Sequence, residues 1–179
     1  MTRTAILTAL VLMSLSHVAT AQRPQVREGF WISGGPGYGS LDLACDGCET
    51  DREGGLTLVL AMGGTVGRGL LLGGEIEGWG KEIEGVDLTV GHVSGVVYWY
   101  PRPTAGFFVK GGAGIASYSV DAGPLGEEDD AGLGLHAALG YDFRVGRNLS
   151  LTPSAGVFWG DFEGGDADVL HVGVAVTGH

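Results

Sequence analysis

Residues 133–159 decide the fold, and they read LGLHAALGYDFR (133–144), VGRN (145–148) and LSLTPSAGVFW (149–159). In the first run Leu133, Leu135 and Leu139 share one face, while His136 and Asp142 share the other. The second run alternates in the same way. Strict alternation over about ten residues indicates a β-strand. Strands of about 9–11 tilted residues cross a bilayer, whereas soluble strands usually have about 5–6. Two such strands joined by a tight turn predict a transmembrane β-hairpin.

Alternation recurs outside this hairpin. It covers residues 30–40, 55–66, 70–80, 86–100, 106–120 and 169–177, although the inward face of 86–100 stays open because both faces carry apolar residues. With the hairpin this makes eight strands, and eight is the smallest common closed barrel. The predicted fold class is all-β, an eight-stranded antiparallel up-and-down transmembrane β-barrel.

The connections between the expected strands alternate in kind. Those after the second, fourth and sixth strands are short and carry Arg68, Arg102 and Arg147. The other four are expected to be longer, and in or beside them lie 17 of the chain's 21 acidic residues: Asp42, Asp46, Glu49, Asp51, Glu53, Glu82, Glu84, Asp87, Asp121, Glu127, Glu128, Asp129, Asp130, Asp161, Glu163, Asp166 and Asp168. An up-and-down barrel places alternate connections at opposite ends, so we expect a cylinder with one acidic end.

Residues 1–21 are predicted to be a secretory signal peptide. Arg3 supplies a positive start, residues 5–15 are apolar, and Ala19-Thr20-Ala21 has the small-x-small pattern of a cleavage site. The remaining residues 22–179 then form a single barrel domain. They contain no apolar run of the ~20 residues that a transmembrane helix needs.

Composition excludes several classes of protein. Glycine supplies 35 of 179 residues without a triplet period, which excludes collagen and disfavours helices. Hydrophobic residues make up 44%, and they alternate, which argues against disorder. The formal charge is −11, and loss of Arg3 with the leader makes it −12, so we expect no binding to nucleic acid.

With these motifs in place, the chain resembles the small bacterial outer-membrane β-barrels that include the OmpA transmembrane domain and its OmpX- and OmpW-like relatives. The resemblance rests on Tyr98-Trp99-Tyr100, on GGAGIASY (111–118) and on LGYDFRVGRNLSLTP (139–153). It implies a porin-like monomer in the outer membrane of a Gram-negative cell, with both termini periplasmic. Its expected partners are membrane lipids, lipopolysaccharide and the barrel insertion machinery. Such barrels commonly end on an aromatic residue used in insertion, whereas this chain ends Thr177-Gly178-His179.

The residues expected to face the lumen suggest an ion-pair network. They are Glu75, Glu77, Lys110, His136, Asp142, Arg144 and His171. Small barrels fill their interior with side chains, and buried charges must pair, so we expect Glu75 and Glu77 beside Lys110 and Arg144. A structural or surface-interaction role follows. The alternatives are a narrow pore for small solutes, or a soluble lipocalin-like periplasmic barrel that binds a small ligand and turns its apolar face inward.

Catalysis has weak support in the sequence. His92 and Ser94, with Asp142 or His136, could be imagined as a lipase- or acyltransferase-like set, but there is no GxSxG motif, and we expect no enzyme activity.

Metal and cofactor sites are likewise not expected. Cys45-Asp46-Gly47-Cys48 lacks a second ligand pair for zinc and is interpreted as a loop disulfide. The acidic connections lack the EF-hand pattern, so we expect a solvated surface, with divalent bridging to lipopolysaccharide phosphates as the functional alternative. No cofactor is expected.

Aromatic residues gather near the expected strand ends, as in the interfacial girdles of membrane barrels. They are Phe30, Trp31, Tyr38, Trp79, Tyr98, Trp99, Tyr100, Phe107, Tyr118, Tyr141, Phe143, Phe158 and Trp159.

Overall fold

The computed structural model describes residues 27–44, 52–83, 86–121, 126–162 and 165–179. The predicted signal peptide and the predicted Cys45–Cys48 disulfide lie outside these residues. Among the residues described, no helix has the length and apolar character needed to cross a membrane.

Long strands account for most of the described chain. They are β1 (Phe30–Ala44), β2 (Glu53–Gly67), β3 (Leu70–Ile83), β4 (Val86–Trp99), β5 (Phe107–Asp121), β6 (Glu127–Tyr141), β8 (Leu149–Phe162) and β9 (Gly165–Gly178). The two-residue strand β7 (Phe143–Arg144) pairs with β8 beyond the end of β6, after a break at Asp142. β7 therefore continues the position of β6 in the barrel and is not counted as a ninth strand.

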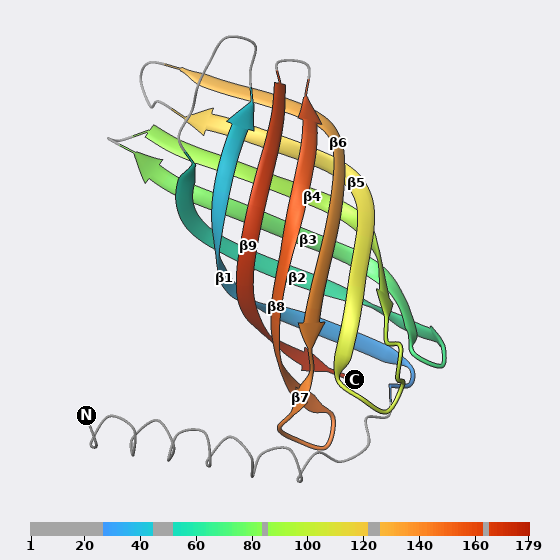
Figure 1. Ribbon diagram of the computed structural model, residues 1–179. Coiled ribbons are helices and arrows are strands. Elements are labelled where there is room, and N and C mark those ends of the chain that lie inside the picture. The colour runs from blue at the N-terminus through green and yellow to red at the C-terminus, as the bar shows by residue number, and fades with distance from the viewer. Residues whose placement is uncertain (1–26, 45–51, 84–85, 122–125, 163–164) are drawn as a thin grey trace, which may run out of the picture.

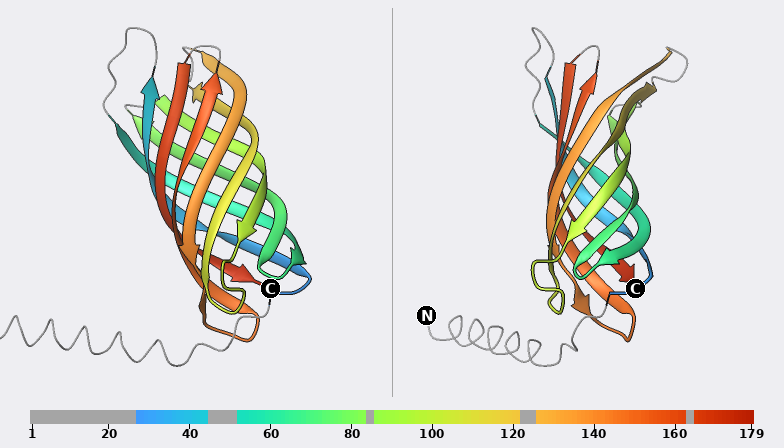
Figure 2. Two further views of the ribbon diagram at one scale, coloured as in Figure 1. Left: turned by 45° about the vertical axis from the view of Figure 1, so that its right-hand side comes forward. Right: turned by 90° about the vertical axis from the view of Figure 1, so that its right-hand side faces the viewer.

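Every neighbouring pair of strands is antiparallel, and the sheet closes on itself. Each strand from β1 to β5 pairs with the next one in the chain, β6 pairs with β8, β8 with β9, and β9 with β1. Figure 1 shows the resulting tilted cylinder, and Figure 2 shows it from two further sides. The predicted eight-stranded up-and-down barrel is confirmed.

The strand faces follow the alternation in the sequence. Large apolar side chains point outward: Leu58 and Ile115, for example, are each 65% exposed. Glu75 points inward and is only 1% exposed. The inward face of β4, which the sequence left open, carries His92 and Ser94. An apolar exterior suits lipid, and it is the reverse of what the lipocalin-like alternative requires.

The strands extend further toward the acidic end than the sequence predicts. Pairing continues to Ile83↔Val86 and to Phe162↔Gly165, so two of the expected long loops are two-residue connections. Conversely, the connection between β4 and β5 spans residues 100–106. The expected contrast between long and short connections is therefore wrong. The ladder hydrogen bonds continue past the apolar part of each strand, because charged side chains on an exposed strand extension remain solvated.

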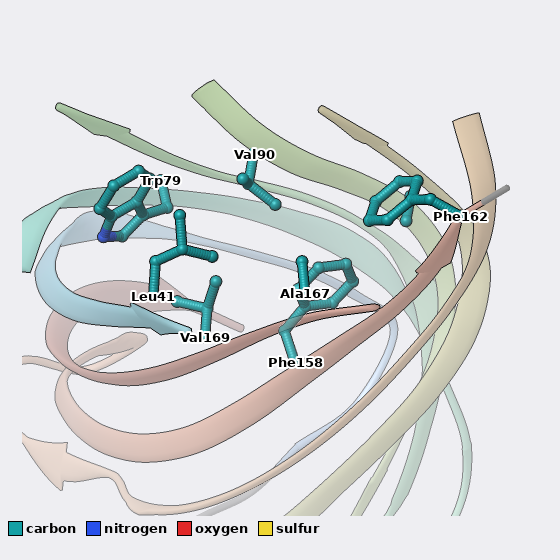
Figure 3. Packing of buried hydrophobic residues seen from close by; sticks show 8 residues of the cluster. Leu41, Trp79, Val90, Phe158, Phe162, Ala167 and Val169 are labelled. Carbon is teal, nitrogen blue, oxygen red and sulfur yellow. The ribbon is translucent and has the colours of Figure 1, made fainter. Parts of the chain in front are cut away.

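Two apolar layers fill the interior of the barrel toward its two ends. The loop-end layer lies near the acidic connections and consists of Leu41, Trp79, Val90, Ala116, Phe158, Phe162, Ala167 and Val169 (Figure 3). The turn-end layer consists of Trp31, Ala61, Leu71, Val96, Tyr98, Tyr100 and Phe108. On β3, Glu75 and Glu77 lie between Leu71 of one layer and Trp79 of the other, so a polar section is enclosed between the layers.

This packing corrects the expectation of aromatic girdles. Phe30, Tyr38, Trp99, Phe107, Phe143 and Trp159 are exposed, whereas Trp31, Trp79, Tyr98, Tyr100 and Phe158 are buried inside the barrel. The physical reason is volume, since a narrow barrel must fill its interior with side chains and glycines on facing positions leave room for large rings.

Candidate functional site

The enclosed polar section is the candidate site. We call it the central lumen cluster and define it as Glu75, Glu77, His92, Lys110, His136 and His171, all of them buried. The residues come from β3, β4, β5, β6 and β9, so the site exists only when the sheet has closed. Five of them belong to the predicted network, and His92 is the addition.

Glu75 is the centre of this cluster. Lys110 Nζ donates to both of its carboxylate oxygens, at 2.6 Å to Oε1 and 2.8 Å to Oε2. The hydroxyl of Tyr98 donates to Oε2 at 3.2 Å. A buried ion pair of this kind is favourable only when such additional hydrogen bonds satisfy the charged groups.

Two histidines lie against the same carboxylate. His92 Nε2 and His136 Nδ1 are 2.9 Å apart, so one imidazole donates to the other. They lie 3.8 Å and 3.7 Å from Glu75 Oε1. The His92 ring stacks on Phe158 with centroids 4.5 Å apart, which connects the cluster to the loop-end layer.

Glu77 and His171 form a second polar pair across the lumen. His171 Nδ1 lies 2.9 Å from Glu77 Oε1. Beside them is a cavity of about 20 Å³, lined also by Thr57 and Lys110, which has room for roughly one water molecule. A cavity of this size is no continuous channel.

Asp142 lies in a separate turn-end cluster, composed of Arg27, Tyr100, Asp142, Thr152 and His179. Arg27 Nη2 donates to Asp142 Oδ2 at 2.8 Å, and Arg27 Nη1 donates to the backbone oxygens of residues 103 and 105 at 3.1 Å. Thr152 Oγ1 donates to Oδ1 at 2.9 Å, and the Tyr100 hydroxyl donates to Oδ2 at 3.0 Å. His179 Nε2 lies 3.7 Å from Oδ2.

The protonation of this turn-end cluster follows from its contacts. Burial alone would raise the pKa of the Asp142 carboxyl, but contacts with His179 and Arg27 and the hydrogen bond from Thr152 hold that pKa below its ordinary value of 3.8. Burial, with the Asp142 carboxylate beside it, raises the pKa of the Tyr100 hydroxyl well above its ordinary value. Asp142 is therefore the anion, and Tyr100 the neutral donor.

The structure contains the expected pairing of Glu75 with Lys110 but places Arg144 elsewhere. Lys110 is the cation at Glu75, while Arg144 is at the turn end and donates to the backbone oxygen of Arg147 at 2.7 Å. The partner of Asp142 is Arg27, which precedes the first strand and which alternation could not assign to any face. A single arginine just before a strand does not indicate, from sequence alone, that its side chain is buried in an ion pair.

The imagined nucleophile arrangement is not assembled. Ser94 Oγ lies 3.4 Å from His136 Nδ1, and Glu75 approaches that same nitrogen. A serine relay needs the base and the orienting acid on opposite ring nitrogens. Asp142 is in the turn-end cluster instead.

Fold and interior together define a class of structure, the small eight-stranded outer-membrane β-barrel, and the chain resembles its members in solved structures. Neisserial surface protein A (NspA) matches over 86% of this chain and 99% of its own, with 12% identity and a TM-score of 0.69. Ail, the attachment invasion locus protein of Yersinia pestis, matches over 84% of this chain and 99% of its own, with 14% identity and a TM-score of 0.60. The backbone structure of the Yersinia pestis outer membrane protein Ail in a phospholipid bilayer nanodisc matches over 84% and 99%, with 13% identity and a TM-score of 0.52.

No family model matches the sequence, and no curated protein matches it. Since the identities to solved structures are 12–14%, these likenesses establish the fold.

Proposed function

We propose that the chain is an outer-membrane barrel with a sealed lumen, and that it acts in membrane structure or surface contact rather than in transport or catalysis. The observation that carries this proposal is the enclosed polar section. The Glu75–Lys110 pair occupies the lumen between two apolar layers, while the outward face is apolar along the strands.

The test is insertion followed by conductance. The chain is refolded into detergent and run on a gel with and without boiling, because closed barrels usually resist SDS until heated. We expect a heat-dependent shift and, in planar lipid bilayers, no regular current steps. Folding in water without detergent would contradict the membrane assignment, and regular current steps would favour the narrow pore.

Contacts with the aqueous surroundings are then confined to the ends of the barrel. The acidic end has an unusual charge pattern. Carboxylates face one another across neighbouring strands at Asp42↔Asp168, Glu82↔Asp87 and Asp161↔Asp166. Like charges in directly opposed positions repel. Arg52 Nη2 offsets one of them, 3.1 Å from Asp42.

Divalent cations shared with lipopolysaccharide phosphates would relieve this repulsion, and we propose such bridging as the surface contact. The measurement is thermal stability of the barrel in lipopolysaccharide-containing vesicles and in plain phospholipid vesicles, each with Mg²⁺ and with EDTA. We expect Mg²⁺ to stabilise the barrel more strongly when lipopolysaccharide is present. An equal effect in both vesicles would contradict the bridging.

A further inference from the structure

The three atoms at the middle of the central lumen cluster form a small triangle. Its corners are His92 Nε2, His136 Nδ1 and Glu75 Oε1, and its sides are 2.9, 3.7 and 3.8 Å. A triangle with these sides has a circumradius of about 2.0 Å, so one point lies about 2.0 Å from all three atoms. Zn²⁺ binds imidazole nitrogen at about 2.0–2.1 Å and carboxylate oxygen at about 2.0–2.2 Å.

The geometry points to a metal site inside the barrel: we propose that Glu75, His92 and His136 bind a divalent first-row transition metal of the kind that prefers imidazole ligands, such as Zn²⁺. The side chains of all three are buried, at 0% exposure for Glu75 and 2% for each histidine. Two histidines and one carboxylate are a donor set typical of zinc and of non-haem iron. This proposal is independent of the proposed function.

The charges of the cluster are compatible with a cation. Glu75 and Glu77 against Lys110 give a formal −1 when the histidines are counted as neutral, and a divalent metal changes this to +1. The enclosed polar section therefore carries a net charge of the same magnitude with the metal as without it. Lys110 can keep its bond to Glu75 Oε2, at 2.8 Å, while Oε1 binds the metal.

Metal binding moves one proton within the site. Two imidazole nitrogens 2.9 Å apart share a hydrogen bond, so one of them carries the bridging proton. A metal between them takes both lone pairs, so the ring that carried the bridging proton holds its hydrogen on the other ring nitrogen instead, and both imidazoles stay neutral. No oxidation or reduction is involved.

The two apolar layers determine how such a metal would arrive. Phe158 of the loop-end layer stacks on His92, and Tyr98 of the turn-end layer donates to Glu75. A metal bound at the triangle is thus separated from both ends of the barrel. We therefore expect loading while the strands assemble, and slow exchange afterwards.

The test compares the order of addition. The tag-free chain is refolded from urea into detergent with Zn²⁺ present, or is refolded first and then given Zn²⁺, and bound zinc is measured by elemental analysis after passage over a chelating resin. We expect one zinc per chain when the metal is present during refolding and several-fold less when it is added later. No retained zinc in either case would overturn the proposal.

The ligands are tested with a matched control. The double variant His92→Gln/His136→Gln should lose the bound zinc, whereas His171→Gln, which changes a buried histidine of the same cluster outside the triangle, should keep it. The gel shift on boiling verifies that each variant folds. Equal zinc in the double variant and the wild type would overturn the proposal.

Should the double variant fail to fold, the wild-type chain refolded with Co²⁺ supplies the decisive measurement. Co²⁺ bound by two imidazoles and a carboxylate has visible absorption bands that differ in wavelength and intensity from those of aqueous Co²⁺. A spectrum identical to that of aqueous Co²⁺ would overturn the site.

Discussion

Gly112 shows how closely a single residue is constrained by this interior. A Cβ atom there would meet the His136 ring and would lie 2.6 Å from the backbone oxygen of Gly95. We expect Gly112→Ala to destabilise the barrel by about 1–3 kcal/mol, because the backbone oxygen cannot yield easily. The measurement is urea unfolding in detergent.

The neighbouring Gly111 supplies the control for this prediction. It faces outward, and its added Cβ would have its nearest neighbour at 3.9 Å. Gly111→Ala should leave stability nearly unchanged. Equal losses in the two variants would mean that strand flexibility, rather than close packing, sets the cost.

Arg27 anchors the residues before β1 to the turn end of the barrel. Its side chain is 2% exposed and pairs with an equally buried Asp142. Arg27→Ala leaves that carboxylate buried without its cation, so we expect a loss on the order of 3 kcal/mol. The exposed Arg68→Ala should change stability by no more than about 0.5 kcal/mol, as read from thermal melts. A comparable loss in both would show that the pair is not responsible.

Asp142 gives this anchor a pH dependence with a definite sign. Its pKa is held below the ordinary 3.8 in the folded barrel, so its carboxylate stabilises the fold above that pH. The contribution is lost as the pH falls through the lowered pKa. In acid titrations of unfolding free energy, the difference between wild type and Asp142→Asn should be constant above pH ~5 and shrink below pH ~4. If the difference in unfolding free energy between the two proteins stayed constant below pH ~4, ionisation of Asp142 would not be its cause.

At the scale of elements, β3 and β5 are coupled through one ion pair although they are not neighbours in the sheet. Glu75→Gln leaves Lys110 buried alone, and Lys110→Met leaves Glu75 without its cation, so each single variant should lose about 3–5 kcal/mol. The double variant removes both charges and should lie closer to the wild type than either single variant. The measurement is a double-mutant cycle, in which the free energy of unfolding is determined for the wild type, the two single variants and the double variant. Additive losses would show that the two side chains act independently.

The elements also show what the sequence could and could not predict. Alternation placed Glu75, Glu77, Lys110, His136 and His171 on the lumen side, because a period of two leaves each strand only two faces. The same alternation placed Trp79 on the face of Glu75, and the expectation of an aromatic girdle conflicted with it. The predicted strand ends differ from the observed ones by several residues, because the solvated ends of the strands lack the apolar alternation on which the prediction rests.

The contact between the two histidines across the lumen was beyond prediction from sequence. His92 and His136 come from β4 and β6, which are separated in the sheet by β5. Their approach depends on the register and curvature of three strands together, and a pattern along one strand does not contain that information. The role of Arg27 was missed for the same reason, since its partner is 115 positions away.

For the molecule as a whole, the outward apolar surface determines where it can reside. Leu60 lies near the middle of β2 and Val66 near its turn end, and both are exposed. In a bilayer, Leu60→Arg should cost about 2–4 kcal/mol and Val66→Arg about 0–1 kcal/mol, because the penalty depends on depth. Stability is measured after refolding into phospholipid vesicles. Equal costs would argue against a membrane-spanning orientation of β2.

The carboxylate of Asp142 is the meeting place of Arg27, which precedes the first strand, and His179, which follows the last. These residues can converge on it only after β1 has joined β9. An open sheet therefore lacks the cation that pairs with this carboxylate, and the closed barrel has it. Closure of the seam between β1 and β9 and completion of the Arg27–Asp142 ion pair are therefore coupled, so an incompletely closed barrel differs in charge from the closed one at its turn end.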